Sequence, residues 1–151
     1  MRRVRGIRIV TTIALAGLAL GMRVAGQEGA AQVTEELLNP VKGKIVKGTF
    51  AISFVGAHLA WGEARGRKCR MLIDGQVGPE YDGISFVVFS PDGKRLAYAA
   101  TRGREGFVVV DGKEGPKYPG LALGSEPTFR PDGSVEYVAA KDDGFYRVVQ
   151  R

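Results

Sequence analysis

The side chains that most often carry out catalysis or bind metals are scarce in this chain. Its 151 residues include one histidine, His58, and one cysteine, Cys69. A structural zinc site needs about four such ligands, and a Ser-His-acid triad needs a serine held in a sharp turn beside the histidine. Neither can be assembled here, so the sequence predicts no catalytic, metal-binding or cofactor-binding residues. Cys69 lies in an apolar stretch, which predicts a buried thiol.

Two pairs of residues remain as candidates for contact with a partner. Glu80-Tyr81 and Lys117-Tyr118 occupy equivalent loops of the internal repeat described below. Equivalent loops of a repeat lie on the same side of the fold. We therefore take Glu80, Tyr81, Lys117 and Tyr118 as a candidate partner-contact rim.

An internal repeat positions these residues. Residues 56–84 align without gaps on residues 93–121, and 12 of the 29 pairs are identical. Chance would supply about two or three. A third copy begins at Phe129, where "FRPDG" matches "FSPDG" from Phe89. The chain is therefore built from units of 37–40 residues.

Each unit has the pattern of short strands separated by turns. Asp-Gly steps, such as Asp111-Gly112, lie between apolar stretches and are strong hairpin signals. Four short antiparallel strands in a unit of this length are typical of a β-propeller blade. The sequence thus predicts an all-β fold, a partial β-propeller of about three four-stranded antiparallel blades at 49–83, 84–125 and 126–151.

The phrase "FSPDGKRLAYAA", from Phe89 to Ala100, resembles the WD40-like (PD40) propeller repeat of TolB-type exported bacterial proteins. The resemblance covers residues 50 to 149. Its motif residues are structural, so it implies a propeller fold and no particular activity. Propellers also occur beside the hydrolase domains of the prolyl oligopeptidase family.

The first 26 residues have the pattern of an export signal, with an arginine-rich start, an apolar run over Ile9–Met22 and then small residues. This predicts a signal peptide at 1–26 and a location in the periplasm or outside the cell. Membrane attachment is expected only if this segment stays uncleaved. Without its five arginines the net charge of +6 falls to about +1, which does not favour nucleic-acid binding.

The remaining segments leave the fold incomplete. Val33–Pro40 predicts a short helix within a lead-in at 27–48. The third unit stops before a fourth strand, which Gly43–Phe50 could supply. Propellers have four to eight blades, so three leave open edges, and open edges favour pairing with another chain. We expect self-association through these edges.

The sequence favours a non-enzymatic module that mediates protein–protein interaction in the periplasm or cell envelope. One alternative is a remnant or accessory propeller of a prolyl-oligopeptidase-like hydrolase. Another is a propeller that binds carbohydrate or peptide once dimerisation completes a ring. Trp61, Tyr98 and Tyr137 occupy equivalent strand positions and could stack on sugars, although packing between blades is the favoured interpretation.

Overall fold

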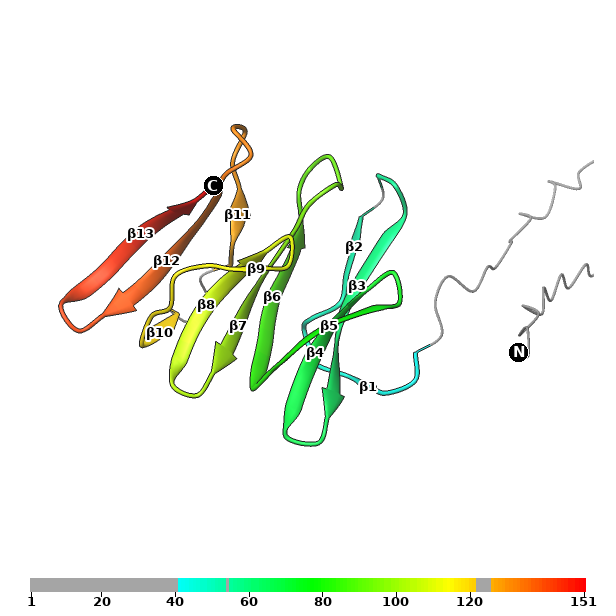
Figure 1. Ribbon diagram of the computed structural model, residues 1–151. Helices are drawn as coiled ribbons and strands as arrows, with labels where there is room; N and C mark the ends of the chain where they lie inside the picture. The colour runs from blue at the N-terminus through cyan, green and yellow to red at the C-terminus, as the bar shows by residue number, and fades with distance from the viewer. Residues whose placement is uncertain (1–40, 54, 122–125) are drawn as a thin grey trace, which may run out of the picture. The chain divides into compact units, whose positions relative to one another are not determined.

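The computed structural model describes residues 41–53, 55–121 and 126–151 (Figure 1). They belong to a compact unit that spans Leu37–Arg151. The signal peptide expected at 1–26 and the helix expected at Val33–Pro40 lie outside the described residues. Within them every regular element is a β-strand, and no helix is long and apolar enough to cross a membrane.

Three antiparallel sheets follow one another along the chain, each forming one blade of a partial propeller (Figure 1). The first blade contains β1 (Lys44–Ile45), β2 (Ala51–Ser53), β3 (His58–Arg65), β4 (Lys68–Ile73) and β5 (Gln76–Tyr81). The second contains β6 (Gly83–Phe89), β7 (Leu96–Arg102), β8 (Glu105–Val110) and β9 (Lys113–Glu114). The third contains β10 (Gly120–Leu121), β11 (Thr128–Phe129), β12 (Val135–Lys141) and β13 (Gly144–Gln150). The predicted all-β, blade-like fold is confirmed.

The offset of 37 residues found in the sequence reappears in the strands, because β4 and β8 have bounds that differ by this offset. Their Asp-Gly hairpins are also alike. Asp74 and Gly75 have φ angles of 50° and 80°, and Asp111 and Gly112 have 51° and 77°. Two consecutive positive φ angles are typical of a type I′ turn, whose twist matches that of the strands it joins.

The first strand of each blade is interrupted. In the second blade β6 pairs with β7 across a bulge between Ser85 and Val88. In the first blade β1 and β2 pair with the same edge of β3, and in the third β10 and β11 pair with the same edge of β12. The first blade therefore begins at Lys44 and the third blade at Gly120, whereas the sequence suggested starts near residues 49 and 126.

The strand expected from Gly43–Phe50 to close the third blade opens the first blade instead. Lys44 pairs with Ala64 and Ile45 with Glu63, both on β3. Pairing with a strand nearby in the sequence closes a shorter loop and costs less conformational entropy. That prediction was wrong.

Apolar side chains join the blades face to face. Tyr81 of the first blade lies edge-on to Tyr98 and Phe107 of the second, at 6.1 Å and 5.8 Å between ring centroids. Tyr118 contacts Tyr137 of the third blade in the same way, at 6.4 Å. Small residues flank Tyr98 on β7, which lets the next sheet approach closely. The second junction buries Ala97, Val108, Val110, Val135, Tyr137 and Ala139.

The outer face of the first blade departs from this apolar pattern. The repeat places Glu63 and Arg70 where the second blade has Ala100 and Phe107, which pack against the first blade. The Glu63 carboxylate is 4% exposed and accepts hydrogen bonds from Arg70, whose Nε lies 2.9 Å from Oε2. A buried ion pair therefore replaces two apolar side chains.

The outer face of the third blade also has charged residues in place of apolar ones. Glu136 and Arg147 stand where the second blade has Ala97 and Val108, which pack against the third blade. No other described blade packs on this face, and charged side chains suit a face in contact with water.

Candidate interaction surface

An open cleft of about 470 Å³ lies between the first strands of the first two blades, β2 and β6. Three of its apolar side chains are strongly exposed: Phe50 at 57%, Ile52 at 40% and Val55 at 57%. An exposed apolar cluster of this kind commonly marks a contact surface. The lining residues are Phe50, Ala51, Ile52, Ser53, Val55, Val87, Val88, Phe89, Ser90 and Pro91.

The Pro-Asp-Gly turn that follows β6 is seated directly against this cleft. Gly93 has a φ of 72°, and a Cβ built there would collide with Ser53 Oγ and the Val55 carbonyl oxygen. The Ser53 hydroxyl donates to that same carbonyl at 2.6 Å. Glycine at this position therefore serves both the backbone conformation and the close contact between blades.

Replacing Gly93 with alanine is expected to lower the free energy of unfolding by about 2 kcal/mol more than replacing Gly103 does, since only the first adds a collision. Gly103 has a similar φ of 62°, but a Cβ there would meet nothing within 4 Å. Urea denaturation of both variants gives the difference. Equal losses would mean that the turn is not held against the first blade.

The lining of the cleft suits the binding of an apolar partner and contains no group for acid–base catalysis. None of its lining residues has an ionisable side chain. The nearest acid in sequence is Asp92, in the turn. Hydrogen bonds from the Ser90 hydroxyl at 2.6 Å and the Lys94 amide at 3.2 Å lower the pKa of its carboxyl. Asp92 is thus an anionic turn residue, and the cleft itself presents apolar surface and serine hydroxyls.

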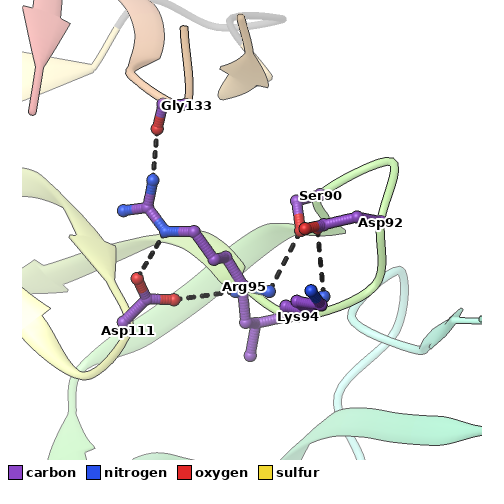
Figure 2. A network of polar contacts seen from close by, with 7 residues as sticks. Ser90, Asp92, Lys94, Arg95, Asp111 and Gly133 are labelled. Atoms are coloured by element: carbon purple, nitrogen blue, oxygen red, sulfur yellow. Dashed lines mark hydrogen bonds and ion pairs between the residues drawn. The ribbon is translucent and has the colours of Figure 1, made fainter. Parts of the chain in front are cut away.

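Arg95 joins the second and third blades beside the same turn (Figure 2). Its Nε donates to Asp111 Oδ2 at 2.7 Å, and a terminal nitrogen donates to the Gly133 carbonyl of the third blade. The guanidinium also lies over the Phe129 ring, 5.5 Å from the centroid. Asp111 Oδ1 accepts the Leu96 amide at 3.0 Å. We call this set of contacts the clasp. It links the start of β7, the hairpin between β8 and β9, and the third blade.

His58 holds the corresponding position in the first blade. Its Nδ1 lies 2.8 Å from Asp74 Oδ2. Its ring stacks on that of Phe89 in the second blade, with 6.4 Å between the ring centroids. Asp74 also accepts the Leu59 amide at 2.9 Å, as Asp111 does for Leu96. Although burial opposes it, these two hydrogen bonds lower the pKa of the Asp74 carboxyl. His58 is therefore a structural member of a second clasp.

Replacing His58 with arginine is expected to raise the free energy of unfolding by about 0.5 kcal/mol, because arginine can reach the next blade as Arg95 does. The gain is small, since the His58 side chain is 44% exposed. Thermal denaturation of this variant, beside Arg95→His, is the measurement. A less stable His58→Arg protein would show that the two clasps are not equivalent.

The candidate rim is only partly accessible. Glu80 and Lys117 are exposed, and Tyr118 is half-buried. Tyr81 is 0% exposed, so its proposed role in contacting a partner is wrong. Tyr81 is the last residue of β5, and because side chains alternate along a strand, its ring faces the second blade. The rim reduces to Glu80 and Lys117, with part of Tyr118.

The aromatic residues of the repeat are also inaccessible. Trp61, Tyr98 and Tyr137 are each 2% exposed, so none of them offers a surface for stacking on sugars. Burial and the nearby charge of Asp82 raise the pKa of the Cys69 thiol, which is 5% exposed as predicted. Among the described residues, no three His, Cys, Asp or Glu side chains gather where they could hold a metal ion.

The sequence did not point to the cleft. Phe50 ends the segment Gly43–Phe50, whose pairing was predicted with the wrong blade, and Ile52 lies just beyond that segment. Exposure of such side chains depends on which sheet they join and on how the first strand is interrupted. A local sequence pattern predicts neither the sheet that a segment joins nor the point at which its strand is interrupted.

Comparison with known proteins adds no identification: no family model, no curated protein and no solved structure matches this chain.

Proposed function

We propose that this chain is an exported, non-enzymatic WD40-like propeller module that binds another protein in the periplasm or cell envelope. The cleft between β2 and β6 is the contact surface in this proposal. The observation that carries it is the exposure of Phe50, Ile52 and Val55 around an open hollow without ionisable lining residues. Such a surface gains free energy by burying apolar area against a partner.

Two features support a protein as the partner. The cleft is open and is lined by residues in and around β2 and β6, which suits an apolar peptide segment better than a small molecule enclosed on all sides. The three strand aromatics that were candidates for stacking on a sugar, Trp61, Tyr98 and Tyr137, are buried. Neither alternative function, a hydrolase accessory or a carbohydrate-binding propeller, has an observation of this kind in its favour.

Site-specific photo-crosslinking tests the proposal. A photoreactive amino acid at Ile52 is expected to form a defined adduct in envelope extract, whereas the same probe at Asp142 is not. Asp142 is exposed and lies in the turn between β12 and β13, away from the cleft lining. The adduct should disappear when Val55→Asp is added, because a charge in the cleft opposes apolar burial.

Circular dichroism of the Val55→Asp protein checks that the fold survives, which is expected because Val55 is 57% exposed. Equal labelling from Ile52 and Asp142, or adducts that persist in the Val55→Asp protein, would overturn the assignment of the cleft.

A further inference from the structure

Among the described residues, one edge of the third blade is unpaired. β13 pairs with β12 over its whole length, and no described strand pairs with its other edge. In the other blades the equivalent edge is occupied, by β5 on β4 and by β9 on β8. Exposed edges are usually protected by charges, proline or shortness. β13 is seven residues long, has no proline and carries one charge, Arg147.

The two complete blades show which sequence fills this position. Their fourth strands contain Gly78-Pro79-Glu80-Tyr81 and lead into Gly115-Pro116-Lys117-Tyr118. The glycine lies tightly against the backbone of the third strand. Gly115 donates its N–H to the Val108 carbonyl at 2.9 Å, and a Cβ on Gly115 would lie only 2.9 Å from that oxygen. A Cβ on Gly78 would lie 3.2 Å from the Met71 carbonyl.

The tyrosine of this motif has a fixed place on the third strand. Tyr81 pairs with Cys69, and Tyr118 exchanges two backbone hydrogen bonds with Gly106, at 2.8 Å and 2.9 Å. In the third blade the register puts Phe145 at the position of Gly106, and Arg147 at the position of Val108.

Phe145 is the most exposed large apolar side chain among the described residues, at 77%. A tyrosine added opposite it would form a cross-strand aromatic pair, one of the more favourable pairs in sheets.

We propose that the free edge of β13 binds an extended segment of a partner polypeptide with the sequence Gly-Pro-x-Tyr, added as an antiparallel fourth strand. The glycine lies over the Arg147 carbonyl and donates its N–H there. The tyrosine covers Phe145. Backbone hydrogen bonds provide the affinity, and these two positions provide the specificity. This inference builds on the proposed interaction function and gives the partner a sequence class at a second surface.

The probe is a fluorescein-labelled peptide, DGKEGPKY, which is the sequence of residues 111–118. Fluorescence anisotropy is expected to rise saturably when the 151-residue protein is added. Changing the peptide glycine before proline to valine should weaken binding about tenfold or more, as should Phe145→Ser in the protein. Phe145→Ser should leave the fold intact because the side chain is exposed. Hydrogen exchange should slow at Gly144–Gln150 when the peptide is bound.

Absence of saturable binding would overturn the inference, as would binding that neither change weakens. Slow exchange in β13 without peptide, together with a dimer in analytical ultracentrifugation, would show that a second copy of the chain occupies the edge, which also overturns it. Crosslinking from Ile52 reports only the cleft. The proposed function and this inference can therefore fail independently.

Discussion

Replacing Tyr81 with alanine is expected to lower the free energy of unfolding by about 4 kcal/mol, the range found for removing a buried aromatic ring. Tyr81 is 0% exposed and contacts two rings of the second blade, Tyr98 and Phe107. The Arg102 guanidinium lies over the same ring at 5.3 Å. Alanine would remove all of these contacts and leave a cavity between blades. Urea denaturation followed by circular dichroism measures the loss.

Two companion variants separate the contributions to this loss. Tyr81→Phe keeps the ring and removes the hydroxyl, which lies 3.5 Å from the Tyr98 hydroxyl. A hydrogen bond this long contributes little, so a cost of about 0.5 kcal/mol is expected. Tyr118→Ala removes the equivalent residue of the second blade, which is only half-buried. If Tyr81→Ala costs no more than Tyr118→Ala, the first junction is not the tighter one.

Most of the fold could be predicted because the sequence repeats its own turn chemistry. Gly93 and Gly133 both follow Pro-Asp, and both have positive φ, at 72° and 80°. Asp74 and Asp111 likewise mark type I′ hairpins. These residues act through their own backbone angles, so their effect can be seen without knowing what packs around them. β4 and β8, which lead into the Asp-Gly hairpins, have the same bounds after the offset of 37 residues.

The parts that could not be predicted depend on contacts between blades. Tyr81 and Tyr118 look alike in sequence, yet one is fully buried and the other half-exposed, because different side chains cover them. The destination of Lys44-Ile45 likewise depended on a choice between two sheets. The bulge in β6 contains Phe86 at a φ of 53°, a conformation that nothing in its residue type predicts.

The candidate surface was less predictable than the fold for the same reason. Glu80 and Lys117 are exposed, as charged side chains usually are. Whether they contact a partner stays a prediction. Phe50, Ile52 and Val55 are apolar and would ordinarily be expected inside. Ile52 lies on β2, Phe50 directly precedes this strand, and Val55 is in the turn that follows it. All three line the cleft beside the Pro-Asp-Gly turn of the second blade and stay exposed.

Replacing Arg70 with methionine is expected to cost about 3 kcal/mol, because it leaves the Glu63 carboxylate buried without its main partner. Arg70 contacts Glu63 through both Nε and a terminal nitrogen, at 2.9 Å and 2.6 Å. Arg65 is a poorer substitute, since its Nε lies 3.4 Å from the same oxygen and its side chain is 57% exposed. Chemical denaturation of Arg70→Met gives the cost directly.

The double variant Glu63→Ala, Arg70→Phe distinguishes the cost of an orphaned charge from that of lost packing. It restores the pair that the second blade has at these positions, Ala100 and Phe107, so most of the stability should return. Apolar replacement of a buried pair removes the desolvation penalty together with the attraction. If the double variant is as unstable as Arg70→Met, the ion pair itself stabilises the first blade, and apolar packing at these two positions cannot replace it.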